Sequence, residues 1–253
     1  MQLKRINVLA LNVHVTTLQE IISLIEFWTL SDQSHTICLS NVHMCMEAHD
    51  DPKFKTVVNC SDLVLPDGKP ISISQRLLGC KQARQVRGTD LTNELCRLSH
   101  LKGYRIGFYG ASQQTLDKLQ FILKRHFSNI NIVFLESPPY RPLTLIEDQN
   151  YISKINQAKV DFLFVGLGCP KQEIWMANHR DSLRCTMLGV GAAFDFISGN
   201  KPPAPKVMQD IGLEWFYRLC CEPRRLFYRY FVHNTRFLLY FSVQFLYRCF
   251  KSS

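Results

Sequence analysis

The sequence predicts an α/β fold: a mostly parallel β-sheet with flanking helices, followed by a C-terminal helical appendage. Between Gly103 and Gly191, short apolar runs typical of strands alternate with amphipathic stretches of helical length, and strands linked by helices pair in parallel through right-handed crossovers. Glycine and polar residues follow the ends of these runs, where ligands bind in such sheets. After Gly199 the chain becomes rich in arginine and aromatic residues. Together these observations indicate a Rossmann-like core and a separate tail.

The first hundred residues are expected to form the N-terminal part of the core. Ile6–Val15 is strand-like, and Thr17 with Glu20 has the spacing of a capping box that opens a helix to about Trp28. Further elements are expected as a strand at Thr36–Ser40, helices through His43–Ala48 and after Pro52, a strand at Asp62–Leu65, and helices at Pro70–Gly79 and Thr89–His100. Proline in the first turn and glycine at the end favour the helix that begins at Pro70.

The second hundred residues have the clearer alternation. Strands are expected at Tyr104–Tyr109, Ile130–Glu136, Asp161–Val165 and Thr186–Val190, with helices at Gln113–His126, Thr144–Ala158 and Lys171–His179. We therefore expect a core over residues 1–200, with an N-terminal part of about 1–100 and a Rossmann-like part of about 101–200. A basic, aromatic tail follows over residues 201–253, after a proline-rich bridge.

The bulk composition narrows the classes of function. The formal net charge of +9 indicates an anionic partner, which could be nucleic acid, anionic lipid or a phosphorylated substrate. Ten scattered cysteines, without a CxxC pair or the Cys/His spacing of a zinc site, favour free thiols in a reducing cytosol. No apolar region follows the basic N-terminus, so a signal peptide is not expected. The apolar stretch Phe237–Tyr247 is too short to cross a bilayer.

The turn Pro66-Asp67-Gly68 offers a candidate catalytic group. A carboxylate between a strand and a helix is held at the ligand-binding edge of the sheet, where Asp67 could act as a general base. The alternative is an ordinary turn, because Asp-Gly is among the commonest turn dipeptides.

Two glycine-rich segments follow later strands. Gly166 and Gly168 would let a ligand approach the backbone, and the helix N-terminus beyond Pro170 could bind an anion; an ordinary strand-to-helix turn is the alternative. The segment Gly189–Asp195 only loosely matches a dinucleotide fingerprint, and no acidic residue stands where a Rossmann dehydrogenase binds ribose.

Arginines supply candidate phosphate ligands. Arg87 beside Gly88 could bind phosphate through two hydrogen bonds, or it could simply pair with Asp90. The tail adds Arg218, Arg225 and Arg229 among many aromatic residues, a combination typical of helices that lie at a membrane surface. Base stacking on nucleic acid and packing between copies in an oligomer are the alternatives for this tail.

The order and wording of these segments resemble the WecG/TagA/CpsF family of bacterial glycosyltransferases, glycosyltransferase family twenty-six. The matching blocks are Asp62–Gly68, Arg76–Gly79, Arg87–Leu91, Tyr104–Ala111, Val165–Glu173, Gly189–Phe196, Gly212–Leu219 and Glu222–Arg225. The resemblance extends from about Ile6 to Phe237.

The resemblance implies an inverting transfer of N-acetylmannosamine, or its uronic acid, from a UDP-sugar to a polyprenyl-diphosphate-linked sugar, with no metal and no other cofactor. Asp67 would be the base. The diphosphate would be neutralised by helix N-termini and by Arg87, Arg218, Arg225 and Arg229. The tail would be a membrane-targeting appendage that folds over the site, so the protein is expected to be cytoplasmic and peripheral on the inner face of the membrane. A homo-oligomer is possible and a nucleic-acid partner is not expected.

The remaining substrate-binding residues are also what the resemblance implies. They are Asn41, Ser40, Gly110, Gly166, Gly168, Lys171, Gln172 and Asp195. One departure concerns Leu39, where the family usually has threonine; Ser40 could substitute for it, and the donor could instead be UDP-glucose or UDP-glucuronate. Rival functions are a non-catalytic membrane-surface scaffold and a nicotinamide- or SAM-dependent Rossmann enzyme.

Overall fold

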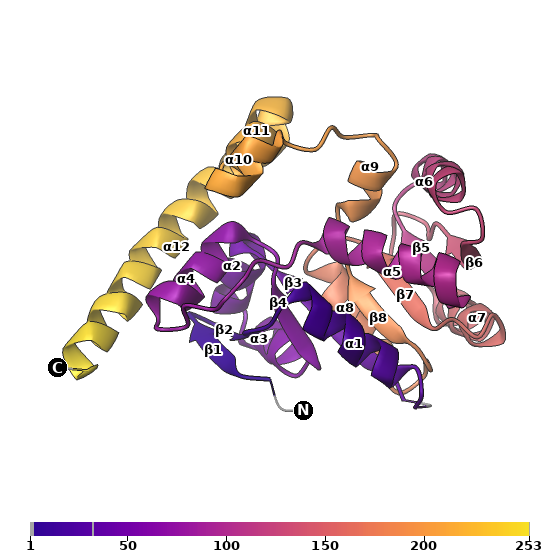
Figure 1. The fold of residues 1–253 in the computed structure, drawn as a ribbon, viewed down its shortest axis with the longest axis horizontal. Helices are drawn as coiled ribbons and strands as arrows, with labels where there is room; N and C mark the ends of the chain where they lie inside the picture. Colours follow the sequence, from indigo (N-terminus) through magenta and orange to yellow (C-terminus); the bar gives the residue numbers. More distant parts are fainter. Residues whose placement is uncertain (1–2, 32, 253) are drawn as a thin grey trace.

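The computed structural model describes residues 3–31 and 33–252, apart from the side chains of Asp210, Arg229 and Ser252. Six strands form one sheet in the order β4-β3-β8-β7-β5-β6, and every neighbouring pair is parallel. Helices pack on both faces of this sheet, and a long C-terminal helix runs along one side of the molecule (Figure 1). The predicted α/β fold, with a Rossmann-like parallel sheet and a helical appendage, is confirmed.

The N-terminal region differs from the prediction of one strand over Ile6–Val15. It forms an antiparallel hairpin of β1 (Arg5–Val8) and β2 (Leu11–His14), whose turn contains Leu9 at φ 53°. Leu-Ala lacks the glycine or asparagine that usually marks a two-residue hairpin, so the turn had no sequence signal. The hairpin is tied to the sheet by His14, whose Nδ1 accepts a 3.0 Å hydrogen bond from the Val64 N–H.

The other elements of the first half lie close to their predicted positions. They are α1 (Leu18–Trp28), β3 (His35–Ser40), α2 (Val42–Asp50), α3 (Pro52–Asn59), β4 (Leu63–Pro66), α4 (Lys69–Leu77) and α5 (Gly88–Lys102). The capping box of Thr17 and Glu20 is present.

The second half alternates as predicted. It contains β5 (Arg105–Gly110), α6 (Gln113–His126), β6 (Asn131–Glu136), α7 (Leu145–Gln157), β7 (Phe162–Gly166), α8 (Lys171–His179) and β8 (Thr186–Gly189). Ser112 caps α6 as expected. A short helix that was not expected, α9 (Ala193–Ile197), follows β8 and occupies part of the second glycine-rich segment.

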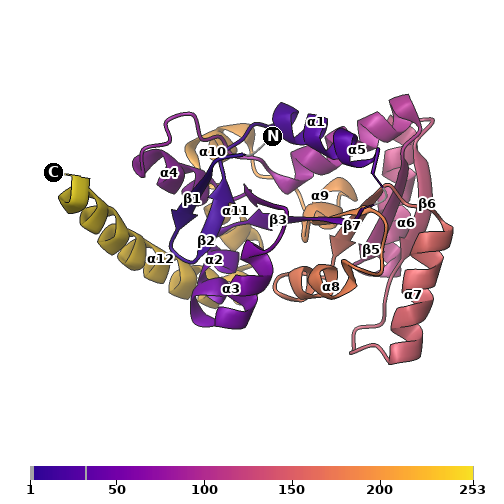
Figure 2. The same cartoon turned by 90° about the horizontal axis from the view of Figure 1, so that it is seen from below.

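The hydrophobic core has two parts, one on each face of the sheet. One part gathers side chains from the hairpin, α2, α3, α8 and α12, and the other gathers those of α1, α5, α6 and α9. Figure 2 shows α1 and α5 on the opposite side of the sheet from α3 and α8. Helices on both faces bury the central strands β3, β8, β7 and β5 almost completely, which explains why these strands are continuous apolar runs, whereas the edge strand β6 is only half-buried.

The tail consists of α10 (Lys206–Ile211), α11 (Glu214–Cys221) and α12 (Pro223–Ser252). Phe237 and Phe241 of α12 are buried against the core, and a fully buried side chain of this size stabilises a contact by about 1.5–3 kcal/mol. The helix is also tied to the hairpin, since Gln244 Oε1 accepts a 3.0 Å hydrogen bond from the Leu9 N–H. Among the described residues, no helix is both long and apolar enough to span a membrane.

Candidate active site

The strand ends of β3 and β4 place the proposed base. Because these strands are parallel neighbours, Ser40 pairs with Pro66, and the segments that follow the two strands leave the sheet side by side. The Ser40 carbonyl accepts hydrogen bonds from the N–H groups of Asp67, at 2.9 Å, and Gly68, at 3.0 Å. The Asp67 turn is therefore fixed at the C-terminal edge of the sheet, which we call the site edge.

Ser40 itself does not present its hydroxyl to the site edge. The residue is fully buried, and its Oγ donates a 2.8 Å hydrogen bond to the Leu65 carbonyl. The expectation that Ser40 substitutes for the family's threonine stays a prediction. The observed contribution of Ser40 is the backbone carbonyl that holds the turn.

The Asp67 carboxyl group lies at the start of α5. Its Oδ1 accepts a 2.8 Å hydrogen bond from the Gly88 N–H, and its backbone carbonyl accepts a 2.6 Å bond from the side chain of Gln85. Burial raises the pKa of Asp67 to about 6, against the opposing effects of the Gly88 bond and of the positive charges on Arg218 and Arg87. A carboxyl group with a pKa near neutrality is well suited to accept a proton.

Asn41 lies directly against this turn. A Cβ atom built at Gly68 would be 3.1 Å from Asn41 Cα and Cβ. The Asn41 side chain accepts a hydrogen bond from the Met44 N–H and so caps α2. Asn41 is therefore brought together with Asp67, as its predicted role beside the sugar requires.

Arg87 is held on two sides. Its Nε donates a 2.8 Å hydrogen bond to Asp90, which is the ion pair considered as the alternative to phosphate binding, and its Nη1 contacts Gln209 of α10. The Arg87 guanidinium thus lies between the core and the tail. It remains close enough to Asp67 to lower the pKa of that carboxyl group.

The tail covers the Asp67 turn. Arg218 of α11 lies over the ring of Phe196, with its guanidinium carbon 4.5 Å from the ring centre, and pairs with Glu214. The charge on Arg218 lowers the pKa of Asp67, whereas the charge on Glu214 raises it. A Cβ atom built at Gly212 would be 3.2 Å from Lys69 Cγ, so the loop between α10 and α11 touches the first turn of α4.

Of the other two predicted tail arginines, the structure describes the side chain of Arg225 but not that of Arg229. Arg225 pairs with Glu222, whose carboxylate also lies 3.1 Å from the Lys201 ammonium group. Lys201 in turn pairs at 2.8 Å with Asp195, so the Asp195 carboxylate takes part in an ion-pair network that leads into the tail. The side chain of Arg229 lies outside the described part of the chain.

Two of the predicted glycines serve close packing. A Cβ atom at Gly110 would come within 2.6 Å of the Gly166 backbone, and one at Gly166 within 2.6 Å of the Phe194 ring. Protein atoms therefore fill the Cβ direction at both glycines, and a ligand contact with their backbone stays a prediction. Gly168 is different, because it has φ 82° and a Cβ atom there would have no described neighbour within 4 Å.

Gln172 lies between the loop after β7 and the loop after β8, since a Cβ atom built at Gly191 would be 3.6 Å from its Oε1. It is 3% exposed, and its Oε1 accepts a 3.1 Å hydrogen bond from the Gly168 N–H. Its Nε2 donates a 2.7 Å bond to Glu173, whose pKa burial raises to about 7. The neighbouring Lys171 is exposed, with its ammonium group 5.1 Å from the Tyr140 ring centre.

Three helices begin near the site edge without a side-chain cap from their own N-cap residue. In the described part of the chain, Gly68, Arg87 and Pro170 provide no such acceptor for α4, α5 and α8. Backbone N–H groups in the first turn of a helix attract anions. The site edge can therefore stabilise negative charge with both helix N-termini and arginines.

Comparison with known proteins tests the family resemblance that the sequence suggested. Residues 6–249 match the model of the glycosyl transferase WecG/TagA/CpsF family. The chain belongs to this family. It is therefore a glycosyltransferase, and the family resemblance in the sequence is confirmed.

Individual relatives have a more specific name. A Staphylococcus aureus N-acetylglucosaminyldiphosphoundecaprenol N-acetyl-beta-D-mannosaminyltransferase is 25% identical over 225 residues, which cover 88% of this chain and 87% of the relative. A Bacillus spizizenii protein of the same name is 31% identical over 191 residues, covering 75% of this chain and 72% of the relative.

Sequence reasoning missed several residues that lie around the Asp67 turn and the site edge. Lys69 follows Gly68 directly and could have been found from its place in the turn, and Glu214 stands four residues before Arg218. Gln209 gave no signal, because only the folded chain brings it to Arg87. Glu173 was part of a quoted block, but its burial was not foreseen.

Proposed function

We propose that this glycosyltransferase transfers a sugar from a UDP-sugar to a polyprenyl-diphosphate-linked sugar, with inversion, in the synthesis of a cell-surface polysaccharide. The observation that supports this most directly is the Asp67 carboxyl group, held by the Gly88 N–H with arginines from both core and tail close to it. The lipid-linked acceptor class follows from the names of the relatives.

In this proposal Asp67 removes the proton from the acceptor hydroxyl group. The hydroxyl oxygen forms a bond to the anomeric carbon of the donor while the bond from that carbon to the UDP oxygen breaks, so the proton ends on Asp67 and the electron pair on UDP. Attack from the face opposite the leaving group inverts the configuration. General-base catalysis of this kind contributes about 10²–10⁴-fold to a rate.

The leaving diphosphate develops negative charge that the protein must stabilise. The sequence contains no DxD metal motif, and we propose that Arg87, Arg218, Arg225 and the N-termini of α4 and α8, which have no side-chain cap from their N-cap residues, perform this task without a catalytic metal. Adding Mg²⁺ or Mn²⁺ to purified enzyme should then leave turnover unchanged. A turnover that requires either ion would contradict this part of the proposal.

N-acetylmannosamine, or its uronic acid, is the favoured sugar, because the relatives are named as N-acetylmannosaminyltransferases. UDP-glucose and UDP-glucuronate remain the alternative donors on account of Leu39. The test is a screen of UDP-sugars with a short-chain lipid diphosphate acceptor, in which UDP release is measured with and without acceptor. Acceptor-dependent release from no UDP-sugar would overturn the proposed function and favour a non-catalytic scaffold.

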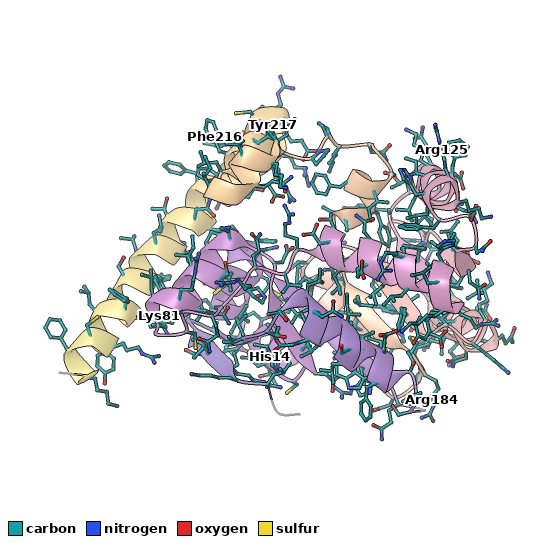
Figure 3. The ribbon with its side chains drawn as sticks, in the orientation of Figure 1. His14, Lys81, Arg125, Arg184, Phe216 and Tyr217 are labelled. Carbon is teal, nitrogen blue, oxygen red and sulfur yellow. The ribbon has the colours of Figure 1, made fainter. Side chains whose placement is uncertain are left out.

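The tail is proposed to bind the membrane surface where the acceptor lies. One set of its side chains is exposed and apolar, and we call this set the apolar tail face: Val207, Ile211, Leu213, Trp215, Phe216, Phe227, Tyr228, Phe231, Leu238, Leu239, Val243, Leu246, Tyr247 and Phe250. Phe216 and Tyr217 stand at the outer edge of the molecule, away from His14 (Figure 3). Large exposed apolar surfaces mark membrane or protein contacts, and nearby basic residues gain about 1 kcal/mol each from anionic lipid.

Sedimentation with vesicles tests this part. The native chain should bind vesicles that contain anionic lipid, and the variant Phe227→Ser/Phe231→Ser should bind less while keeping its circular dichroism. Equal binding by both chains would contradict the membrane assignment. A concentration-dependent dimer that the same variant abolishes, without vesicle binding, would assign the apolar tail face to a second copy instead.

A nicotinamide- or SAM-dependent enzyme can be separated from this proposal by thermal shift. UDP should raise the melting temperature, whereas NAD and SAM should not. Stabilisation by NAD or SAM alone would overturn the proposed donor class.

A further inference from the structure

Two histidines and a glutamate meet where the tail helix α12 lies on α2. The Nδ1 atom of His43 is 3.5 Å from Glu47 Oε1, and the Nε2 atom of His233 is 3.9 Å from the same oxygen. One potential ligand atom from each of the three residues lies within 4.8 Å of the others. The cluster thus joins two segments that are far apart in the sequence.

The local structure explains why these side chains converge. His43 and Glu47 are four residues apart on α2, so they share one face of that helix. His233 stands on the docked side of α12, in register with Leu226 and Phe237, which are both buried. The two imidazole rings are partly buried and pack edge to face, with centroids 5.1 Å apart.

We propose that His43, Glu47 and His233 form a binding site for a divalent transition-metal cation of the zinc class. Two imidazole nitrogens and a carboxylate oxygen are a donor set that zinc commonly takes in proteins, with a remaining position for water. Ligand atoms about 3.3 Å apart would surround a tetrahedral zinc ion at its usual bond lengths. The separations from Glu47 Oε1, 3.5 Å to His43 and 3.9 Å to His233, both exceed this value, so the three side chains would draw together by rotation when an ion binds.

The ion would fasten the tail to the core. Beside the cluster, Arg236 of α12 makes a 2.7 Å hydrogen bond to Asp50 of α2, and His49 stacks on Tyr240 with ring centroids 4.6 Å apart. These contacts already hold the two helices side by side, so the metal site is largely formed before the ion binds. Because α11 and α12 are consecutive helices of the tail, the ion would also favour the position of Arg218 near Asp67. This inference concerns tail docking and does not depend on the sugar donor.

The test is a titration of the full chain with Zn²⁺ and with Co²⁺, under reducing conditions and after removal of bound metal. We expect one ion per chain. Co²⁺ should give the intense visible absorption of a low-coordinate site without a sulfur-to-cobalt charge-transfer band, because the ligands are nitrogen and oxygen. Mg²⁺ should not compete, since it prefers an all-oxygen octahedral shell.

The variants His233→Asn and Glu47→Gln should each weaken Zn²⁺ binding by more than about 100-fold, which exceeds the usual effect of losing an outer-shell partner. His126→Asn is the matched control, because it removes an exposed histidine of α6 that lies outside the cluster, and it should bind the ion like the native chain. Arg236→Gln removes no ligand but breaks the ion pair that helps to hold α12 on α2, so it should weaken binding less than either ligand variant.

Tail docking provides a second readout. Zn²⁺ should slow amide hydrogen exchange in α12 of the native chain and of His126→Asn, and should leave exchange in Glu47→Gln unchanged. The inference is overturned if the native chain binds neither ion at one per chain, if His233→Asn or Glu47→Gln binds it as tightly as the native chain, or if a thiolate band dominates the cobalt spectrum. Loss of transfer activity plays no part in these outcomes, so they are independent of the proposed function.

Discussion

The Oδ1 atom of Asp67 accepts a 2.8 Å hydrogen bond from the backbone N–H of Gly88. This bond joins the end of β4 to the first residue of α5, and it leaves the second carboxylate oxygen as the group that can receive a proton. It also places the carboxylate at a helix N-terminus, where negative charge is favoured. Burial acts in the opposite direction, and the balance raises the pKa of Asp67 to about 6.

Replacement of the base should abolish most of the activity without unfolding the protein. In Asp67→Asn the side-chain oxygen can still accept the Gly88 N–H, but the amide cannot take up a proton. We expect the rate of UDP release to fall by about 10³-fold, with an unchanged circular dichroism spectrum. Asp117→Asn is the control, since Asp117 bonds to Gln113 on the exposed face of α6. An Asp67→Asn enzyme of near-native activity would refute the assignment.

The same carboxyl group predicts the pH dependence of the reaction. Asp67 must be deprotonated to act as a base, and its pKa is raised to about 6. The value of kcat/KM should therefore rise with pH through about 6 and level off above it. The measurement is initial rate at low donor concentration over a pH series. A rate that falls over this range would indicate that Asp67 acts in its protonated form.

Arg218 should influence both turnover and this pH profile. It lies near enough to Asp67 to lower the pKa of the carboxyl group, and in the proposed mechanism it stabilises the leaving diphosphate. Arg218→Gln should reduce kcat by about 10²-fold, as loss of one stabilising donor does in other enzymes, and should move the acid limb to higher pH.

The matched control for Arg218 is Arg97→Gln. Arg97 also pairs with a glutamate on its own helix, at Glu94, but on an exposed face. Its replacement should change neither kcat nor the acid limb. If both variants lose activity equally, the loss in Arg218→Gln comes from the lower net positive charge of the protein and not from a local contribution of Arg218 to the site.

Glu173 predicts how stability depends on pH. Its pKa is raised from 4.5 to about 7 because the side chain is buried, so the folded state holds this proton more tightly than the unfolded state. The stabilisation that the folded state gains from holding this proton is fully present below pH 4.5 and is lost as pH rises through about 7. Glu173→Gln removes this loss, and its stability relative to the native chain should grow by about 3 kcal/mol between the two ends of this range.

Urea unfolding at a series of pH values measures this difference. The control is Glu94→Gln, because an ion pair with Arg97 lowers the pKa of Glu94 and its replacement should show no such growth. A constant difference between native and Glu173→Gln proteins would mean that Glu173 is already ionised in the folded state.

Leu39 should affect the choice of donor. It is 4% exposed, and a Cβ atom built at Gly88 would lie 2.8 Å from its Cδ1, so it fills the space beside the Asp67–Gly88 bond. Leu39→Thr should cost about 1–3 kcal/mol of stability through the cavity it leaves. It should also change the ratio of rates with different UDP-sugars, while the Kd for UDP stays the same. An unaltered donor ratio would show that Leu39 does not select the sugar.

Much of the fold was predictable because its signals are local. The strand runs, the Ser112 cap and the capping box of Thr17 depend on residues that are neighbours in the chain, and helices α6 and α8 have the predicted bounds. The hairpin was the exception, since a turn at Leu9 has none of the residues that normally indicate one. Helix α9 was hidden in a segment whose glycines suggested a loop.

The candidate site was predictable only in part. The motif around Asp67 and the family resemblance followed from the order of residues, and so did the idea that arginines neutralise the diphosphate. The sequence did not reveal that Ser40 is buried, or that Gly110 and Gly166 are needed for close packing. Burial and close approach depend on neighbouring strands, which a linear pattern does not identify.

The sequence by itself thus determined most of the strands and helices of the core, apart from the hairpin and α9, together with the family and the presence of a basic aromatic tail. Only the tertiary structure decided that Gln209 meets Arg87, that Arg218 lies near Asp67, and that His233 reaches Glu47. The physical reason is distance along the chain. Periodicity and capping arise from contacts between residues a few positions apart. The site and the proposed metal cluster instead depend on where a tail helix packs against core residues that stand more than a hundred positions earlier in the sequence.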